Sequence, residues 1–374
     1  MTVVVTGAKG FIGQNLMIHL GERGVHAVGF DVGDDPADMR AAVAAADFVF
    51  HLAGVNRPET EDEFETGNAG LTGEVCQILA GARNRAPLVI TSSTQVERDN
   101  PYGRSKLAAE QAVLAHGAAT GAPVHVFRLT NVFGKWARPN YNSAVATFCY
   151  NTANGLPISV NDPAAPLKLV YVDDVCAAFL RVLDNATAAH GDSPGFAHAG
   201  PEYDTTVGAV ADTIRGFPES RSTLVSDRVG TGLTRALHAT YLSYLKPEQF
   251  AYDVPCHGDP RGVFVEMLKT PDCGQFSYFT AGPGITRGQH YHHTKTEKFL
   301  VLTGRARFGF RHIITGETLH LEVEGGQGRI VETIPGWTHD ITNVGAEEMV
   351  VMLWANEIFD RLRPDTVAMS VGLD

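Results

Sequence analysis

The chain has 374 residues, which is enough for two domains that each bury a sizeable core. Acidic residues outnumber Lys and Arg by 42 to 30, and the net charge of −12 argues against sequence-independent nucleic-acid binding, which needs a basic face. The five cysteines form no C-x-x-C pair, no signal peptide precedes the first strand, and no apolar run approaches the roughly 18 residues of a membrane span. We therefore expect a cytoplasmic protein with reduced thiols and with no nucleic-acid or membrane partner.

A glycine-rich turn follows the first predicted strand. Residues 3–5 are apolar, and Gly7, Gly10 and Gly13 lie between them and an amphipathic helix that runs to residue 20. The first glycine permits a tight turn, the second lets the backbone approach a pyrophosphate, and the third allows close helix–strand packing. The positive end of the helix dipole would face the phosphates. The pattern predicts a dinucleotide site.

The second predicted strand, residues 27–30, ends at Asp31. This is the usual place for the acid that accepts the adenosine ribose hydroxyls, and a carboxylate there repels a 2′-phosphate. No arginine follows before Arg40. Alternatively, Asp31 turns aside as a turn former in the loop of residues 31–35. The residues themselves favour NADH.

The TGxxGxxG form of residues 6–13 resembles the extended short-chain dehydrogenase/reductase family, and later segments match it in order: 51–54, Asn68, 89–93, the Y-x3-K pair at 102–106, 128–134 and 171–175. The resemblance implies a doubly wound α/β Rossmann domain over residues 1–245. It also implies a set of cofactor-binding residues, namely Gly7, Gly10, Phe11, Ile12, Gly13, Asp31, Leu52, Ala53, Tyr102 and Lys106. The family points to NADPH, so NADPH and NADH both stay open, and we expect NADH to be used at least comparably.

The Y-x3-K spacing has a chemical reason. Tyr102 and Lys106 are four residues apart and share a helix face. A tyrosine with a free pKa of about 10 is a poor acid–base group near neutrality, and a nearby cation lowers that pKa. Lys106 can supply the charge and hold the nicotinamide ribose. Ser93 is expected to hydrogen-bond the substrate oxygen, although register alone leaves Ser92 and Thr94 open.

The periodic pattern stops between residues 135 and 162, where extended reductases build their substrate lobe. Mixed aromatic, amide and basic groups there suit a nucleotide-sugar, so we predict substrate contacts from Asn131, Lys135 and Asn140. Any single residue of this loop could instead be an ordinary polar surface residue. Residues 203–245 are predicted to be helical and to close the lobe, and residues 246–253 are predicted to be a linker.

Histidines and a glutamate recur at metal-ligand spacing in the second half. His290 and His292 are two apart, so on a strand both imidazoles leave the same face, and Glu297 follows five residues later. Two imidazoles and a carboxylate suit a divalent metal with one position left open. His339 offers a fourth donor downstream. The metal is expected to be zinc, although nickel, iron or manganese could occupy such a site.

These two segments resemble the signature motifs of the cupin barrel. The pattern G-x5-H-x-H-x4-E-x6-G fits from Gly284 to Gly304, and the second motif fits at Gly336, His339 and Asn343 with its proline one residue closer than usual. The resemblance implies an all-β cupin domain over residues 254–374. It also implies that His290, His292, Glu297 and His339 bind one metal.

The segment 259–266 resembles the D-x-R-G-x-F-x-E segment of nucleotide-sugar 3,5-epimerases, which implies that Arg261 and Glu266 contact the substrate. In those epimerases a histidine at the position of His290 is the base, but a metal ligand cannot easily be a free base as well. A side chain is expected to take that role, with Lys269 slightly ahead of Glu266. A metal-bound hydroxide is the alternative.

Over its whole length the chain resembles the bifunctional capsular-polysaccharide enzymes of the CapF type, in which a reductase precedes a metal cupin. The resemblance implies C3 epimerisation of a UDP-2-acetamido-2,6-dideoxy-4-keto-hexose in the barrel. Reduction of its C4 ketone with NAD(P)H then gives UDP-N-acetyl-6-deoxy-L-talosamine, the precursor of UDP-N-acetyl-L-fucosamine for capsule or O-antigen. We expect a homodimer.

Two other interpretations stay open. The chain could be a nucleotide-sugar 4-ketoreductase whose cupin domain only binds sugar or holds a dimer together, and it would then keep full turnover after metal removal. It could also be a non-catalytic nucleotide sensor, although such sensors typically lack the Y-x3-K pair.

Overall fold

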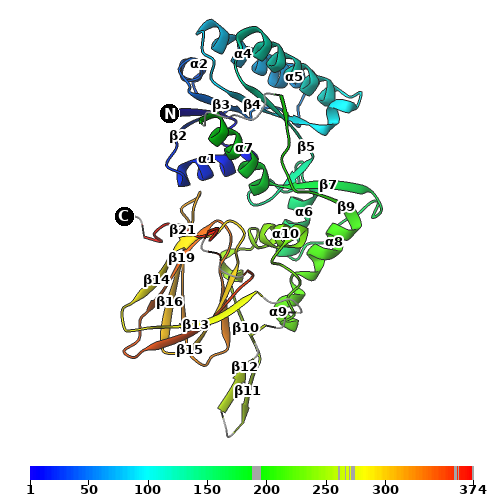
Figure 1. The fold of residues 1–374 in the computed structure, drawn as a ribbon. Coiled ribbons are helices and arrows are strands. Elements are labelled where there is room, and N and C mark those ends of the chain that lie inside the picture. The colour runs from blue at the N-terminus through cyan, green and yellow to red at the C-terminus, as the bar shows by residue number, and fades with distance from the viewer. Residues whose placement is uncertain are drawn as a thin grey trace. The chain divides into compact units, whose positions relative to one another are not determined.

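The computed structural model describes residues 1–187, 195–259, 262–265, 267–268, 270, 274–357, 360 and 362–372. The chain divides into two compact units (Figure 1). The first comprises residues 1–133 and 167–204, and the second comprises residues 134–166 and 205–374. The predictions made for Arg261, Glu266 and Lys269 lie outside the described residues.

A six-stranded sheet with the order β2-β1-β3-β4-β5-β8 forms the centre of the first unit. All of its neighbouring strands pair in parallel. The strands are β1 (Thr2–Thr6), β2 (His26–Phe30), β3 (Phe48–His51), β4 (Leu88–Ser93), β5 (Val124–Leu129) and β8 (Gly195–Ala197). The chain moves to one side of β1 for β2 and to the other side for β3, which makes the gap between β1 and β3 the topological switch point, where α/β sheets bind ligands.

Helices cover both faces of this sheet. One face carries α2 (Pro36–Ala44), α4 (Leu71–Gly81) and α5 (Pro101–Thr120), and the other carries α1 (Phe11–Glu22) and α7 (Val172–Thr187) (Figure 1). Shorter helical turns are α3 (Asp62–Phe64), η1 (Glu65–Gly70) and η2 (Thr94–Glu97). A small three-stranded sheet has the order β6-β7-β9, formed by β6 (Asn131–Phe133), β7 (Pro166–Tyr171) and β9 (Glu202–Thr206).

Alternation along the strands divides the core between the two helical layers. Val49 lies in one buried cluster with Val75 of α4. On the opposite face, Phe50 and Phe127 contact the ring of Phe179 in α7, with centroids 5.8 Å and 4.9 Å apart. Because successive strand residues point to opposite faces, these apolar runs are buried on both sides, as a parallel sheet requires.

The second unit begins with a helical part. Its helices are α6 (Ala144–Ala153), α8 (Val207–Gly216), α9 (Glu219–Thr223) and α10 (Gly232–Leu242), followed by the turn η3 (Pro247–Gln249). Ser143 and Thr206 cap α6 and α8, because each hydroxyl accepts a hydrogen bond from a backbone N–H three residues on. Helix α10 packs against α6 and α8.

Two antiparallel five-stranded sheets follow in the same unit. Their orders are β10-β18-β15-β20-β13 and β17-β16-β19-β14-β21, and a separate hairpin pairs β11 with β12. The strands are β10 (Ala251–Asp253), β11 (Cys256–Asp259), β12 (Gly262–Val265), β13 (Gln275–Ala281), β14 (Thr286–Tyr291), β15 (Glu297–Thr303), β16 (Arg305–His312), β17 (Thr318–Glu324), β18 (Arg329–Glu332), β19 (Trp337–Asn343), β20 (Met349–Ala355) and β21 (Val367–Ala368). Phe299 of one sheet and Phe308 of the other meet with ring centroids 5.7 Å apart, so the two sheets enclose an aromatic core.

The helical part covers the outer face of the first of these sheets. Leu224 and Val229 share a buried cluster with Leu300, Ile330 and Trp354. A charge network reinforces this contact: the Arg221 guanidinium donates to the Glu332 carboxylate, which also lies 3.2 Å from the Lys298 ammonium. By packing, these helices therefore belong with the barrel.

The predicted fold class is confirmed: a doubly wound α/β domain precedes a cupin-like pair of antiparallel sheets. The domain bounds predicted from the sequence, 1–245 and 254–374, differ from those of the compact units. Residues 134–166 and 205–245 group with the barrel in the second unit. Within the described part of the chain, no helix is long and apolar enough to cross a bilayer.

Candidate active sites

The glycine-rich turn lies at the switch point of the parallel sheet. Gly7 adopts a left-handed φ of +71°, and a Cβ built on it would lie 2.7 Å from the backbone nitrogen of Ala53, two residues beyond the end of β3. Only a residue without a side chain allows this approach. Phe11 and Ile12 open α1 directly after the turn, so the predicted cofactor residues of β1, α1 and β3 gather at one edge of the sheet.

Asp31 follows β2 at the same edge, and its carboxylate is held by backbone groups. One oxygen accepts the Lys9 N–H at 2.7 Å, and the other accepts the Val32 N–H at 2.8 Å. The ammonium of Lys9 lies 3.1 Å from Asp34 instead. Asp31 thus acts within the turn of residues 31–34 and also contacts the glycine-rich turn. Its role toward a ribose stays a prediction.

The Tyr102 site (Ser93, Tyr102 and Lys106) joins the end of β4 to the first turns of α5. The Ser93 hydroxyl hydrogen-bonds Tyr102, which singles out Ser93 among the three hydroxyls left open by the sequence. The Lys106 ammonium donates to the Thr91 carbonyl at 3.2 Å and lies 6.0 Å from the centre of the Tyr102 ring. The three catalytic residues predicted for the reductase are therefore brought together.

Burial sets the protonation of this site. It raises the pKa of Tyr102 above its usual value, and the Ser93 hydrogen bond opposes that rise only in part. The pKa of Tyr102 is thus raised, in the direction opposite to the lowering expected from a nearby cation. Burial also lowers the pKa of Lys106 to about 8. At neutral pH the site holds a protonated phenol, which can give a proton, beside a cation.

Asn68 supports the Tyr102 site. The sequence motif includes this residue but does not show the contacts that it makes. Its amide accepts from the Val55 N–H at 2.9 Å and donates to the Ser105 hydroxyl at 3.0 Å. A Cβ at Gly54 would lie 2.7 Å from the Asn68 amide oxygen and 3.0 Å from the Lys106 ammonium. Asn68 therefore ties the loop after β3 to the helix that carries the catalytic pair.

The predicted substrate residues lie in different environments. Asn131 is exposed and donates to the Lys168 carbonyl at 3.0 Å. Lys135 is fully buried, with its ammonium 5.1 Å from the centre of the Trp136 ring. Asn140 is exposed, and its backbone N–H donates to the Thr147 hydroxyl. Their contacts with a substrate stay predictions, and the burial of Lys135 favours a structural role in the free protein.

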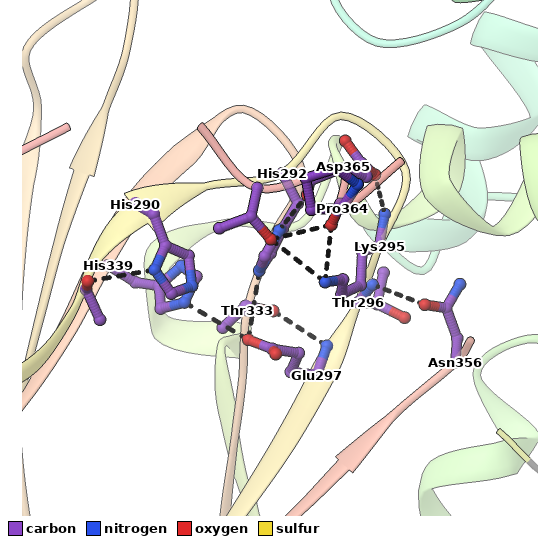
Figure 2. A network of polar contacts seen from close by, with 12 residues as sticks. His290, His292, Lys295, Thr296, Glu297, Thr333, His339, Asn356, Pro364 and Asp365 are labelled. Carbon is purple, nitrogen blue, oxygen red and sulfur yellow. Dashed lines mark hydrogen bonds and ion pairs between the residues drawn. The ribbon is translucent and has the colours of Figure 1, made fainter. Parts of the chain in front are cut away.

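The barrel site (His290, His292, Glu297 and His339) brings together one donor atom from each side chain, all within 4.8 Å of one another (Figure 2). One Glu297 carboxylate oxygen lies 3.2 Å from His292 Nε2 and 3.4 Å from His339 Nε2. The His290 ring lies 4.7 Å from the His339 ring and 5.0 Å from the His292 ring. Four residues from β14, the following turn, β15 and β19 thus converge as the spacing predicts.

The chemistry of these donors fits a divalent cation. Burial, and then the neighbouring His339 and His292, lower the pKa of His290 to about 4, so its imidazole is neutral at pH 7. Burial raises the pKa of Glu297, but the contacts with His292 and His339 outweigh this and hold the pKa well below its usual value. Within the described residues, His339 Nε2 has no aligned hydrogen-bond partner. Neutral imidazoles and an ionised carboxylate are the ligands that zinc and similar metals prefer.

The strand geometry differs in detail from the expectation of two histidines on one regular strand. Strand β14 ends at Tyr291, so His292 lies in the turn beyond it. A bulge interrupts the pairing with β19 between Gly288 and His290, and Gln289 has a left-handed φ of +60°. Bulges re-aim side chains, and this one directs His290 toward the other ligands.

Lys298, the residue after the ligand Glu297, faces away from the barrel site. It follows Glu297 on β15, so its side chain leaves the opposite face. Its ammonium donates to the Tyr252 hydroxyl at 2.7 Å and pairs with Glu332. Lys298 is thereby committed to the network on the outer face of the sheet, and no base is assigned in the described part of the barrel.

Comparisons with known proteins agree with both halves of this description. Residues 3–193 match the NAD dependent epimerase/dehydratase family, and residues 257–367 match the polysaccharide biosynthesis C-terminal domain. The chain therefore belongs to the NAD dependent epimerase/dehydratase family.

Full-length relatives define the family more closely. The chain is 54% identical to the UDP-2-acetamido-2,6-beta-L-arabino-hexul-4-ose reductase of Pseudomonas aeruginosa, with 100% of this chain and 99% of the relative covered. The crystal structure of the capsular polysaccharide assembling protein CapF from Staphylococcus aureus matches with a TM-score of 0.68 and 39% identity, over 99% of this chain and 100% of that one. The chain belongs to this CapF-like family.

A more distant structure shows the fold of the first half alone. UDP-glucuronic acid 4-epimerase from Bacillus cereus, solved with NAD, matches 59% of this chain and 84% of its own, with a TM-score of 0.52 and 17% identity.

Proposed function

We propose that this chain is a bifunctional nucleotide-sugar enzyme. The barrel epimerises C3 of a UDP-2-acetamido-2,6-dideoxy-4-keto-hexose, and the first unit reduces the C4 ketone with NAD(P)H. The product is UDP-N-acetyl-6-deoxy-L-talosamine, a precursor of UDP-N-acetyl-L-fucosamine. The observation that carries the proposal is that one chain holds both a Tyr102–Lys106 pair beside Ser93 and a buried cluster of four metal-type donors. The name of the P. aeruginosa relative supports the reduction step.

In the reduction, a hydride from the nicotinamide is added to C4, and the ketone oxygen takes the proton of the Tyr102 hydroxyl. Ser93 hydrogen-bonds Tyr102 and would bond the same substrate oxygen. The raised pKa of Tyr102 keeps the proton available at neutral pH, and the nearby Lys106 cation favours its departure once negative charge develops on the substrate. The reaction consumes one NAD(P)H and one proton per ketone.

In the epimerisation, the C3–H bond breaks and re-forms from the opposite face, with no net change in electrons. A divalent cation held by His290, His292, Glu297 and His339 would supply Lewis-acid polarisation of a carbonyl, which acidifies the adjacent carbon. The chain's own part is to hold three imidazoles beside one ionised carboxylate in a buried pocket. We propose zinc as the metal, because the reaction needs no redox change.

The two steps complement one another. An epimerised ketone can revert, because the proton next to the carbonyl stays acidic. Reduction removes the ketone and fixes the new configuration. A reductase in the same chain therefore makes the epimerisation effectively irreversible.

Product analysis by NMR in D2O tests the proposal. Without reduced nicotinamide, the 4-keto substrate should gain solvent deuterium at C3. With reduced nicotinamide, the product should carry that deuterium at an inverted C3 and a new hydrogen at C4. Reduction with a retained, undeuterated C3, unchanged by metal removal, would instead support a 4-ketoreductase whose barrel only binds sugar or holds a dimer together.

A further inference from the structure

The C-terminal strap, defined as residues 364–371, lies against the loop that joins the two strands of the first metal motif. This loop, residues 292–296, connects β14 to β15 and lies about 70 residues earlier in the chain. Figure 2 shows Pro364 and Asp365 beside His292 and Lys295. The Lys295 ammonium donates to the Pro364 carbonyl at 3.0 Å and lies 3.2 Å from the Thr366 hydroxyl.

The Asp365 carboxylate anchors the strap to the backbone of this loop. One oxygen accepts the His293 N–H at 2.9 Å. The other accepts the N–H groups of Thr294 and Lys295, at 2.9 Å and 2.7 Å, and the Thr294 hydroxyl at 3.0 Å. Four hydrogen bonds to one ionised side chain form a strong, geometrically specific connection, because charge-assisted bonds are roughly twice as strong as neutral ones.

The Asp365 backbone contacts a metal ligand directly. The His292 Nδ1–H donates to the Asp365 carbonyl at 2.6 Å. This bond keeps a proton on Nδ1 and orients the ring so that Nε2 is the nitrogen that faces Glu297, at 3.2 Å, and is the one that can turn a lone pair to a bound metal. Asp365 has a left-handed φ of +37°, a conformation that persists where surrounding contacts enforce it.

The rest of the strap is tied to the strands of the other ligands. Strand β21 pairs with β14 at His290 and Tyr291. The Met369 N–H donates to the Gln289 carbonyl, within the bulge that aims His290, and the Met369 carbonyl accepts from the Thr338 hydroxyl, beside His339. One segment therefore contacts residues next to, or at, three of the four ligands.

We propose that the C-terminal strap is a built part of the metal site and that Asp365 is its positioning residue. Its carboxylate holds the loop of residues 293–295, and its carbonyl sets the tautomer and direction of His292. The inference rests on the proposed metal site and adds a component that neither signature motif contains. It predicts that metal affinity depends on a residue that touches no metal.

The test compares Asp365→Ala with Asp360→Asn. Asp360 is a matched control, because its carboxylate also accepts a backbone N–H in the C-terminal region, from Leu362, but does not contact the ligand loop. Zinc and cobalt affinities are measured by chelator competition, and the visible absorption of bound cobalt reports the ligand geometry. Asp365→Ala keeps the carbonyl that His292 contacts but loses the carboxylate that holds it in place. Substitution of groups that support metal ligands typically costs about 10–100-fold in metal affinity, and we expect Asp365→Ala to fall in that range with an altered cobalt spectrum. Asp360→Asn should match the unsubstituted protein.

A measurement without metal guards against a general loss of folding. In the metal-free protein, ¹⁵N shifts of the His292 ring report whether Nδ1 carries a proton. Nδ1 should be protonated in the unsubstituted chain and in Asp360→Asn, and only partly protonated in Asp365→Ala and, to a lesser extent, in Asp365→Asn. Reduction of an already epimerised ketone should continue in every variant, which shows that the first unit remains folded.

The two proposals fail in different ways. If the unsubstituted protein binds no metal that depends on His290 and His292, the proposed metal site is wrong. If it binds such a metal, and Asp365→Ala binds it with equal affinity, the same cobalt spectrum and the same His292 tautomer, the strap has no positioning role.

Discussion

The Tyr102 site and the barrel site differ in where their parts come from in the chain. Ser93, Tyr102 and Lys106 lie within 14 consecutive positions, on one strand and the helix that follows it. The barrel site needs His290, Glu297 and His339 from three strands, and its supporting strap comes from the last residues of the chain. A site made from one strand–helix unit can be recognised from a short motif, whereas a site between sheets depends on long-range pairing.

The two sites also differ in how their charges are balanced. Lys106 is buried, its ammonium donates to the neutral Thr91 carbonyl, and its pKa is lowered to about 8. Glu297 is buried beside two imidazoles that hold it ionised. The first arrangement leaves a group that titrates near physiological pH. The second holds its protonation state fixed and favours a cation, so the two sites should respond differently to pH, metal and cofactor.

Loss of the metal ligands should have the largest effect. In a His290→Ala/His292→Ala double variant, zinc should fall from about one per barrel to none, because two of four donors are gone. Exchange at C3 should stop, while an already epimerised ketone is still reduced. Metal analysis and the D2O assay measure both. Stoichiometric metal in this variant would refute the ligand assignment.

Removal of the Tyr102 phenol should give the reverse result, with loss of reduction and an intact barrel site. Tyr102→Phe takes away the proton donor, and loss of a positioned acid–base group typically costs about 10²–10⁴-fold in rate. The rate of ketone reduction, measured by nicotinamide absorbance, should fall by that factor. Zinc content and C3 exchange should stay unchanged. If exchange stopped as well, the two-site model would fail.

Substitution of Asp31 should change the preference between NADH and NADPH by a smaller factor. A carboxylate at the ribose hydroxyls disfavours a 2′-phosphate, so NADH should be used at least comparably to NADPH. Asp31→Asn should shift the ratio of kcat/KM values toward NADPH by about tenfold, as expected for about 1.4 kcal/mol of relieved repulsion. Asp34→Asn, in the same turn, is the control. A strong preference for NADPH in the unsubstituted enzyme would mean that Asp31 does not face the ribose, and Lys9 or Arg40 would become the phosphate partner to test.

The pH dependence of reduction should show the smallest change. With a pKa of about 8, Lys106 is mostly protonated at pH 7 and loses its positive charge as the pH rises through that value. We expect kcat/KM for reduction to decline several-fold between about pH 7 and 9, because deprotonation follows the single-group titration. Lys106→Arg, which stays charged, should remove the decline even if its overall rate is lower. A decline that persists in Lys106→Arg would assign the titration to another group.

Much of the fold and most of the two sites could be predicted from the sequence, because the signals are local. The glycines of residues 7–13 lie in one turn, and the pairs Tyr102/Lys106 and His290/His292 are separated by fixed short spacings. Periodicity placed β1, α1 and β2 within three residues of their observed bounds.

What the sequence did not indicate depends on tertiary context. The raised pKa of Tyr102 results from burial, which a motif does not report. The bulge at Gln289 and the bond from His292 to the Asp365 carbonyl involve backbone groups, which carry no residue-specific signal. An aspartate that accepts several N–H groups from a distant loop leaves no spacing pattern, and this is why Asp365 was not among the predicted residues.

The helices between residues 205 and 245 belong to the reductase by sequence and to the barrel by packing. A recombinant barrel that began at residue 254 would lose Leu224 and Val229 and leave the apolar side of Leu300 and Trp354 bare, an aggregation hazard. It would also strip Arg221 from the buried carboxylate of Glu332. Dissection at the apparent linker would thus damage the piece it is meant to isolate.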